Sequence, residues 1–491
     1  LERHEEALGA FGRAIALRPD LAEAHRGRGN SLVALDRAGE ALAAYERSLA
    51  LAPGAAPAHA GYAAALVRLA RPDAAVAAAR RAIVLDPALP EGHLHLGRAF
   101  EALGRLQDAA SAARDALRLR PEFPEAWNNL ALALHLDDRL DEAEPCYRRA
   151  LALHPDSAAV HYNLGNLHRD RRQLDAALAA YGRALALDPD HADAHWNRAL
   201  TWLWQGDWER GWPEYEWRWR RREWPPRAFP QPRWDGGPLD GRTVLLHAEQ
   251  GLGDTIQFVR YGPLVRARGA GRVVVECQPP LVRLLSGIGG VDEVVATSSA
   301  LPPFDVHAPL LSLPGLLGTT TASVPAPCPV SAVGGLLPAD HSTIRVGLAW
   351  SGNPAHPRNA RRSCPVHQLG PLAEVPGVTW YTLHHDPSWP VPPIPLERHP
   401  AVDSLDGLAA LIASLDLVVT VDTVTVHLAG SLGTPAWLLI DFLSDWRWGF
   451  EGDRTPWYPS LRLFRQPAAG AWEPVVAAVA DALGSWRAPK F

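Results

Sequence analysis

The sequence contains no methionine and only four cysteines among its 491 residues. The chain starts inside a repeat and lacks an initiating Met, so we expect that the true N-terminus is missing or was removed. The cysteines lie far apart without CxxC spacing, which is typical of reduced thiols in a cytosolic protein and predicts no metal site. They are Cys146, Cys277, Cys328 and Cys364.

Long apolar runs and an excess of positive charge are also absent. No uncharged apolar run reaches about 18 residues and no secretory signal stands at the N-terminus, so we expect a cytoplasmic protein without a transmembrane helix. The formal net charge of −6 argues against a nucleic-acid binder, which is usually basic. At about 150 residues per domain, the length predicts about three domains.

Prolines recur every 34 residues in the first half of the chain, a period typical of tetratricopeptide repeats. Small and aromatic residues keep the same phase, so that Ala143 and Tyr147 of one unit correspond to Ala177 and Tyr181 of the next. The pattern predicts an α-solenoid over residues 1–222 that coils into a superhelix with a concave groove. The prolines are Pro19, Pro53, Pro87, Pro121, Pro155 and Pro189.

An asparagine takes the same place in three successive repeats, at Asn129, Asn163 and Asn197. Equivalent positions stack along a solenoid, so these amides could form a ladder that bonds the N–H and C=O groups of an extended peptide. The alternative is that Asn is tolerated on a solvated helix face, and the earlier units carry His95 and Gly61 at this place. We expect the groove to be the docking place for a protein partner.

The last repeat unit changes to a segment rich in tryptophan and arginine, residues 208–222. Aromatic rings beside Arg side chains could stack on nucleic-acid bases, but an end repeat must also cover its open face. We interpret the rings as a cap that packs the array against the next domain. Residues 223–240 then form a proline-rich connection.

From Arg242 onward, short β-branched strands alternate with helical stretches, which predicts parallel sheets. A loop rich in Pro and Gly at about 314–342 separates two such sets. We therefore expect two α/β lobes, at 241–335 and 342–491, with a closing helix from 472 to about 486. The expected strands are 243–248, 272–277, 293–296, 305–310, 344–350, 378–384, 417–422, 435–440 and 461–465.

The strand at 417–422 ends in Asp422 and Thr423, followed by a short helix. The first amides of a helix have no partners inside it and lie at the positive end of its dipole. In an open α/β sheet, ligands bind at the carboxyl ends of the strands, so this turn could hold a nucleotide diphosphate. The alternative is a buried turn in which Asp422 only caps the helix.

A second turn, Gly251-Leu-Gly253-Asp254, follows the first expected strand of the first lobe. Its glycines would let the backbone turn sharply and approach a ligand. Asp254 would open the next helix facing the other lobe, where it could remove a proton from an acceptor hydroxyl. A helix cap alone is the other interpretation of Asp254.

The second lobe places polar and cationic side chains after its first strand. Cations beside the helix terminus at Thr423 would neutralise a pyrophosphate leaving group, although Arg clusters are also common on solvated surfaces. The residues concerned are Ser351, Gly352, Asn353, Arg361 and Arg362.

Another strand of the second lobe ends in His384, His385 and Asp386. At that edge these residues could contact a base or a ribose, and a metal pair is the alternative. Residues 240–491 contain no Asp-x-Asp, so ligands for a divalent cation are not obvious and no metal is predicted.

Five motifs of the second half are informative in combination: Gly251-Leu-Gly253-Asp254, Val346-Gly-Leu-Ala-Trp350-Ser-Gly-Asn353, Arg361-Arg362-Ser363, Val421-Asp422-Thr423 with His427-Leu-Ala-Gly430-Ser-Leu-Gly433, and Asp445-Trp446-Arg447-Trp448 with Trp457-Tyr458-Pro459. Together with the repeats they resemble bacterial tetratricopeptide-repeat proteins with a glycosyltransferase domain of the heptosyltransferase, or family nine, type. The resemblance covers essentially the whole chain. It implies a GT-B fold, in which the second lobe holds most of a nucleotide-sugar, and a metal-independent, inverting transfer.

The resemblance also implies roles for individual residues. Asp254 matches the candidate general base of the heptosyltransferases, and Asp422, Thr423 and His427 match their sugar and phosphate motif. Their glycine after the threonine is Val424 here. The nucleotide-sugar site implied in this way comprises Gly251, Gly253, Ser351, Gly352, Asn353, His384, Asp422, Thr423 and His427.

Those enzymes place a lysine against the pyrophosphate, and Arg361 or Arg362 would have to replace it here. The repeat array is also similar to that of the O-linked N-acetylglucosamine transferases and of repeat-bearing flagellin transferases, which modify proteins. We therefore expect a glycosyltransferase that acts on a protein held by the repeats. Transfer to a lipid or polysaccharide precursor and a scaffold with inactive transferase lobes, which Val424 favours, remain open.

Overall fold

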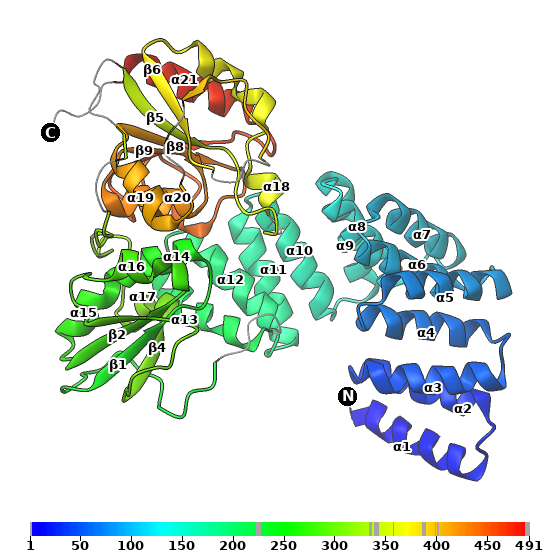
Figure 1. The fold of residues 1–491 in the computed structure, drawn as a ribbon. Helices are drawn as coiled ribbons and strands as arrows, with labels where there is room; N and C mark the ends of the chain where they lie inside the picture. Colours follow the sequence, from blue (N-terminus) through cyan, green and yellow to red (C-terminus); the bar gives the residue numbers. More distant parts are fainter. Residues whose placement is uncertain are drawn as a thin grey trace. The chain divides into compact units, whose positions relative to one another are not determined.

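The structure is a computed structural model that describes residues 2–221, 227–332, 336–337, 343–356, 358–384, 389–397, 399 and 402–486. The chain divides into two compact units, Leu1–Ala194 and His195–Phe491 (Figure 1). In the part of the chain that is described, none of the helices combines the length and the apolar composition needed to cross a membrane.

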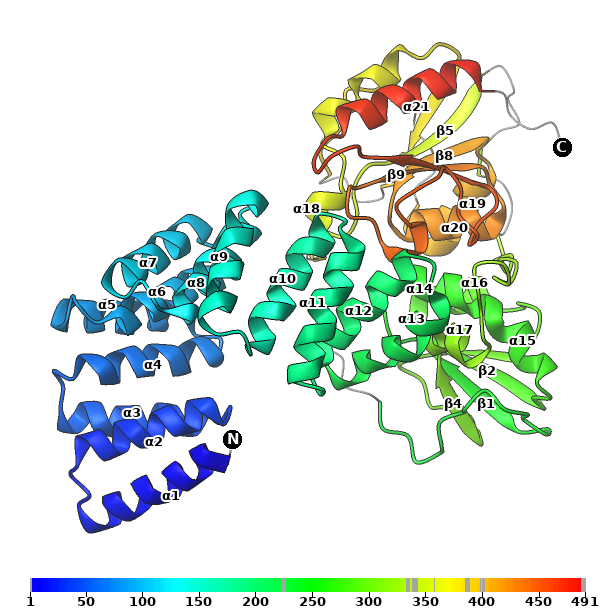
Figure 2. The ribbon, with the colours of Figure 1, turned by 180° about the vertical axis from the view of Figure 1, so that it is seen from behind.

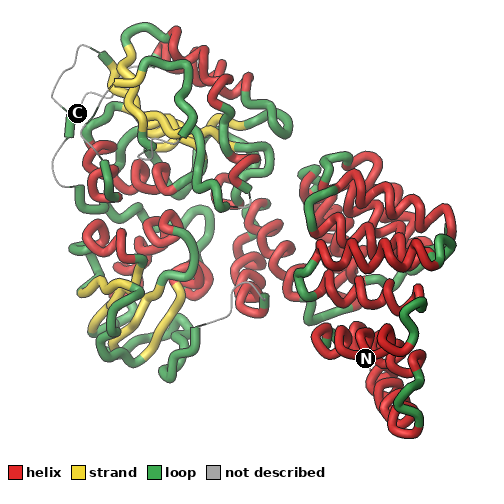
Figure 3. Tube along the Cα trace, turned by 45° about the vertical axis from the view of Figure 1, so that its right-hand side comes forward, coloured by secondary structure: helices red, strands yellow, loops and turns green. Residues whose placement is uncertain are grey.

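The first unit is a solenoid of antiparallel helix pairs, which confirms the prediction from the proline period (Figure 3). The second helix of each pair ends two residues before one of the six periodic prolines, because the residue preceding a proline is disfavoured in the helical conformation. The helices are α1 (Glu2–Leu17), α2 (Ala22–Ala34), α3 (Ala38–Leu51), α4 (Ala56–Arg68), α5 (Pro72–Leu85), α6 (Pro90–Ala102), α7 (Leu106–Leu119), α8 (Pro124–Leu136), α9 (Leu140–Leu153), α10 (Ala158–Asp170) and α11 (Leu174–Leu187).

Small residues let the paired helices approach closely. Gly165 of α10 faces the ring of Tyr181 of α11, and a Cβ at position 165 would lie 2.6 Å from that ring. Tyr181 itself is fully buried, as is the equivalent Tyr147 of the preceding pair. The repeated small and aromatic positions of the sequence are therefore the contacts that hold each pair together.

The second unit begins inside helix α12 (Ala192–Trp204), so the divergent last repeat packs with the α/β region. Helix α13 (Trp208–Tyr215) and the 3₁₀ helix η1 (Glu216–Arg220) follow. The rings of Trp208 and Trp212 are buried against Trp446 and Trp457 from the end of the chain. These rings are thus core of the second unit and not a stacking surface for bases.

The α/β region has two separate sheets, and all of their paired strands are parallel. The first has the order β3-β2-β1-β4 and the second the order β10-β9-β8-β5-β6-β7. All nine expected strands are present, with ends that differ by at most two residues, whereas the very short β7 had no sequence signal. The strands are β1 (Thr243–His247), β2 (Arg272–Cys277), β3 (Glu293–Ala296), β4 (Val306–Pro309), β5 (Ile344–Ala349), β6 (Val378–Thr382), β7 (Leu396–Glu397), β8 (Leu417–Val421), β9 (Ala436–Ile440) and β10 (Leu461–Arg465).

Short helices join the two sheets. Helices α19 (Leu405–Ala413) and α20 (Val424–Leu432) of the second lobe pack against each other (Figure 1). Helix α19 also contacts α16 (Val282–Leu285), and α20 contacts α14 (Leu252–Phe258); both partners belong to the lobe that contains the first sheet. Figure 2 shows α21 (Glu473–Ser485) on the face of the six-stranded sheet opposite to the one that α19 and α20 cover. The other described helices are η2 (Val259–Tyr261), α15 (Gly262–Ala267), η3 (Pro279–Leu281), η4 (Leu310–Ser312), α17 (Leu313–Leu316), α18 (Asn359–Arg362), η5 (Val366–Glu374) and η6 (Trp446–Trp448).

The close contact at Gly165 can be tested with a matched pair of glycines. We expect Gly165→Ala to destabilise the first unit, because overpacking a buried ring costs about 1–3 kcal/mol and exceeds the about 0.5–1 kcal/mol gained by removing a helical glycine. Gly182→Ala in α11 has no atom within 4 Å of the new Cβ and should be stabilising. Urea unfolding followed by circular dichroism measures both, and equal stabilisation by the two variants would contradict the contact.

Candidate functional site

The second unit contains a cavity of about 510 Å³ at the carboxyl ends of β5, β6 and β8. Strands β5 and β8 are neighbours in the sheet, and the chain runs from β5 outward to β6 on one side and from β8 outward to β9 on the other. This is the topological switch point, at which open α/β sheets bind ligands. The position of the cavity therefore follows from the strand order.

Two helices begin at this cavity. Ser404 is the N-cap of α19 and accepts a hydrogen bond from the backbone N of Gly407 at 3.2 Å. Thr423 is the N-cap of α20 and accepts one from the backbone N of Thr425 at 3.3 Å. Both N-caps line the cavity, so the positive ends of two helix dipoles meet there.

The other walls of the cavity are mainly apolar and aromatic, with Leu383, Trp389 and Leu408 among them. The ring of His384 stacks on Trp389 with 4.4 Å between centroids. Its Nε2 accepts a hydrogen bond from the backbone N of Trp350 at 3.2 Å, which fixes the orientation of the imidazole. The cavity thus combines a flat aromatic wall with two helix N-termini that carry partial positive charge.

The structure brings five of the predicted site residues to this cavity, and the other seven do not line it. A residue between the two glycines of the first turn, Leu252, also lines it. His385 and Asp386 lie outside the described residues. The five lining residues are Ser351, Gly352, Asn353, His384 and Thr423; those that do not line it are Gly251, Gly253, Asp254, Arg361, Arg362, Asp422 and His427.

The loop after β5 distinguishes the two candidate arginines. Arg361 is exposed, whereas Arg362 is half-buried and lies against Gly352, where a Cβ would come within 2.6 Å of its Nη2. The Nε of Arg362 is buried and has no hydrogen-bond acceptor among the residues that the structure describes. Burial lowers the pKa of Arg362, and the negative charge of Asp422 opposes that shift. Of the two candidates, Arg362 is therefore the one that contacts a residue lining the cavity.

The first turn of α14, at Gly253, packs against α20, which begins after Thr423. A Cβ on Gly253 would lie 2.5 Å from Cδ2 of His427, so only glycine lets α14 approach α20 this closely. His427 is buried, and its Nδ1 lies 3.1 Å from the hydroxyl of Tyr458. Burial lowers the pKa of His427 well below its ordinary value, so the imidazole is neutral and serves as a packing surface between the turns.

Arg447 of η6 links the carboxylates of this region, and sequence reasoning assigned it no role. Its guanidinium pairs with Asp254 of α14 and, at 2.9 Å, with Asp445. Asp254 also accepts a hydrogen bond from the backbone N of Gly251 at 2.9 Å. Burial raises the pKa of Asp254 and of Asp422, and the positive charge of Arg447 opposes both shifts. The Asp-Trp-Arg-Trp motif, which places charged residues inside an aromatic segment, was the feature of the sequence that could have indicated a buried ion pair here.

The three asparagines are divided between the two units. In the first unit, Nδ2 of Asn163 donates to Oδ1 of Asn128 at 3.0 Å. Nδ2 of Asn129 is buried and finds no acceptor within the described ranges. Asn197 belongs to the second unit and is buried. Asn129 and Asn163 are thus the members of the predicted ladder that belong to the repeats of the first unit.

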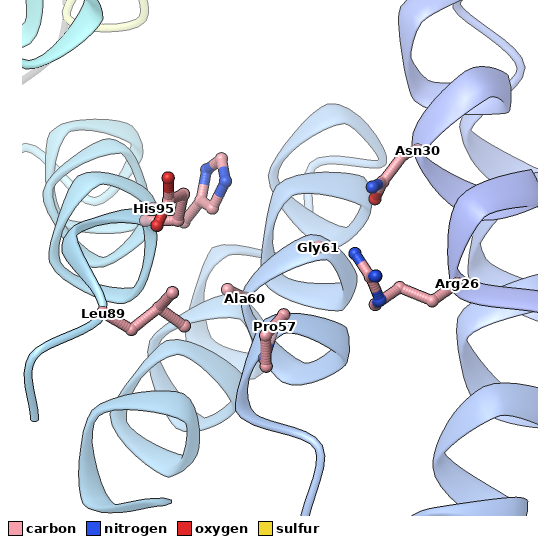
Figure 4. A pocket seen from close by; sticks show the side chains of 8 residues that line it. Arg26, Asn30, Pro57, Ala60, Gly61, Leu89 and His95 are labelled. Atoms are coloured by element: carbon pink, nitrogen blue, oxygen red, sulfur yellow. The ribbon is translucent and has the colours of Figure 1, made fainter. Parts of the chain in front are cut away.

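A second cavity, of about 440 Å³, lies in the first unit among α2, α4 and α6. Figure 4 shows Arg26 and Asn30 on one side of it and His95 on the other, with Gly61 between them. Gly61 and His95 stand where later repeats carry the ladder asparagines. This cavity therefore lies at the repeats in which glycine and histidine replace the asparagine of the predicted ladder.

Within the described stretches, no three or more His, Cys, Asp or Glu side chains are grouped so that they could hold a metal ion.

Comparison with known proteins supports the helical repeats. Residues 1–56, 26–90, 63–122 and 94–158 match the family described as Tetratricopeptide repeat, 165–206 match TPR repeat, and 146–179 match a further Tetratricopeptide repeat family. Over 333 residues the chain is 29% identical to Protein FlbA of Caulobacter vibrioides, which covers 59% of this chain and 55% of FlbA. The chain thus spans about half the length of this curated relative.

Two solved structures resemble parts of this chain, both with TM-scores below 0.5. The structure of the APC/C hetero-tetramer Cut9-Hcn1 is 21% identical, with a TM-score of 0.42, covering 44% of this chain and 43% of that one. A thermophilic TPR protein of Thermus thermophilus is 27% identical, with a TM-score of 0.35, covering 37% of this chain and 99% of that one. The family matches show that the N-terminal part of the chain consists of tetratricopeptide repeats.

The neutral state of His427 predicts how stability depends on pH. The imidazole has a depressed pKa when folded and an ordinary pKa of about 6.5 when unfolded, so protonation favours the unfolded chain. Its contribution to stability is present above pH 6.5 and is lost as the pH falls, by up to about 1.4 kcal/mol per pH unit. We expect the unfolding free energy of His427→Asn to decrease less than that of the original protein between pH 7.5 and 5.5. Equal decreases in urea unfolding would contradict the prediction.

Proposed function

We propose that this protein is a glycosyltransferase of GT-B type that moves a sugar from a nucleotide-sugar to a hydroxyl group of a polypeptide. The observation that supports the proposal most directly is the cavity at the switch point of the six-stranded sheet. Two helix N-termini open onto it, Arg362 lies beside it, and the turn that carries Asp254 adjoins it through Leu252. Groups that could bind phosphate and a residue that could act as the base thus lie close together.

The cavity suits a nucleotide-sugar donor. Its volume of about 510 Å³ lies within the range of about 300–1,000 Å³ typical of small-molecule sites. The N-termini of α19 and α20 offer backbone amides to the phosphates, and Arg362 adds a positive charge. Trp389 and its apolar neighbours provide the wall on which a base would lie.

The proposed reaction is a displacement at the anomeric carbon of the sugar. The acceptor hydroxyl oxygen forms a bond to that carbon while the bond from the carbon to the diphosphate oxygen breaks, and the diphosphate leaves with the electron pair. Asp254 takes the proton of the hydroxyl. Burial raises the pKa of Asp254, which makes its carboxylate a stronger base than an exposed one. Arg362 and the helix N-terminus at Thr423 stabilise the charge of the leaving diphosphate.

The repeats would present the acceptor. Tetratricopeptide repeats commonly bind extended peptides, and the side chains of Asn129 and Asn163 lie at equivalent positions of successive repeats in the first unit. Transfer to a lipid or polysaccharide precursor would not require these asparagines to contact the acceptor.

A non-catalytic scaffold is the second candidate, and Val424 favours it. This residue lines the cavity at the place where the heptosyltransferases carry a glycine, so its side chain narrows the room for a sugar. A scaffold would keep the fold of the cavity but would not turn over a donor.

Arg361 and Arg362 provide a matched test of the donor site. We expect Arg362→Ala to weaken the binding of nucleoside diphosphates at least tenfold, because the cation beside the cavity is lost. Arg361→Ala should change the affinity less than twofold, because that side chain is exposed. Isothermal titration with UDP, GDP and ADP measures both affinities. If none of the three nucleotides binds the original protein, the non-catalytic scaffold becomes the preferred function. If both variants bind them with equal affinity, Arg362 does not contact the diphosphate.

The asparagines separate a protein acceptor from a small one. We expect replacement of Asn129, Asn163 and Asn197 together by Ala to raise the KM for a protein acceptor about tenfold or more, while donor hydrolysis stays unchanged. Initial rates with protein and small-glycan acceptors provide the comparison. Equal activity of the variant on both would favour the lipid or polysaccharide precursor as the acceptor.

A further inference from the structure

Arg447 is a nearly buried cation that connects the two sheets of the second unit. Its side chain is 9% exposed and extends from η6, after β9, to the carboxylate of Asp254 at the first turn of α14. The same guanidinium pairs with Asp445, which also accepts a hydrogen bond from the backbone N of Arg447 at 3.1 Å. One cation is therefore held between two carboxylates, one on the helix that follows β1 of the first sheet and one in the loop that follows β9 of the second sheet.

The surroundings of Arg447 fix the direction of its side chain. The guanidinium lies 5.0 Å from the ring centroid of Trp446 and 5.6 Å from that of Phe258, and the aromatic rings keep water away from the ion pair. A pair of charges interacts more strongly in such a low-dielectric place than at the surface. The Asp254 carboxylate thus receives one N–H bond from its own turn and a strong one from Arg447.

Without Arg447, the carboxylate of Asp254 would be in an unfavourable electrostatic position. It is largely buried and has the negative charge of Asp445 nearby, and both effects favour the protonated acid. A protonated Asp254 could not accept the proton of an acceptor hydroxyl. The cation that opposes both effects is Arg447.

We propose that Arg447 is the positioning residue for Asp254, which it keeps ionised and pointing in a fixed direction next to the donor cavity. The proposal rests on the proposed transferase function, in which Asp254 is the base. Because Arg447 and Asp254 come from different sheets, the base is complete only while α14 and η6 are packed together. Arg447 therefore couples the packing of the two sheets to the ionisation of one carboxylate.

The experiment compares the pH dependence of kcat/KM for Arg447→Gln, Arg447→Lys and a control. In the glutamine variant we expect the acid limb of the profile to move up by at least one pH unit, so that kcat/KM falls about tenfold on the acid limb and changes least at high pH. The lysine variant keeps the charge and should retain most of the original profile. A uniform loss of rate at every pH, with the acid limb unmoved, would overturn the proposal.

Arg345→Gln is the matched control for loss of a buried ion pair. Arg345 pairs with Asp416 at 3.0 Å, and its side chain is 14% exposed, but it lies on β5 near the end opposite the cavity. Its replacement should lower the stability of the fold without moving the acid limb. A shift of the limb by this variant, equal to that of Arg447→Gln, would show that the effect arises from destabilisation.

Carboxyl titration tests the same inference without relying on transfer activity. The ¹³C carboxyl signal of Asp254 is assigned by its loss in Asp254→Asn, and its titration midpoint is measured in the original protein and in Arg447→Gln. We expect a higher midpoint in the variant. If the original protein turns over no nucleotide-sugar, the proposed function fails and this titration alone decides the role of Arg447; an unchanged midpoint overturns that role.

Discussion

The contact between Gly253 and His427 is the constraint on which the candidate site depends. Because position 253 has no side chain, the first turn of α14 lies directly against the imidazole of α20. That approach places Leu252 in the wall of the cavity and brings Asp254 within reach of Arg447. A larger residue at 253 would separate the two helix turns, and with them the groups that the proposed chemistry needs.

The charged groups around this contact act on one another. Arg447 balances Asp254 and Asp445, and its field also acts on Asp422. His427, at the centre, stays neutral because burial and the nearby cations disfavour its protonation. Buried ion pairs contribute little net stability compared with apolar packing. Their placement at a helix N-terminus beside a cavity is more readily explained by function.

The tryptophan-rich end of the repeats has a structural role in the second unit. Trp208 and Trp212 pack against Trp446 and Trp457, so the last repeat is joined to the segment that carries Arg447. Arg218 is fully buried there and pairs with Glu249 through two hydrogen bonds of 2.9 and 3.1 Å. The repeat end thus supports the elements that form the candidate site.

The sequence by itself determined the helical repeats, the parallel strands and the turns at Gly253 and Thr423. Periodic prolines and apolar β-branched runs are local signals, because helix ends and buried strands depend on neighbouring residues in the chain. The tertiary structure decided which arginine lies beside the cavity and that Arg447 pairs with Asp254, 193 residues away in the chain. Such pairings depend on how separate sheets pack, and a single sequence carries no local signal for that.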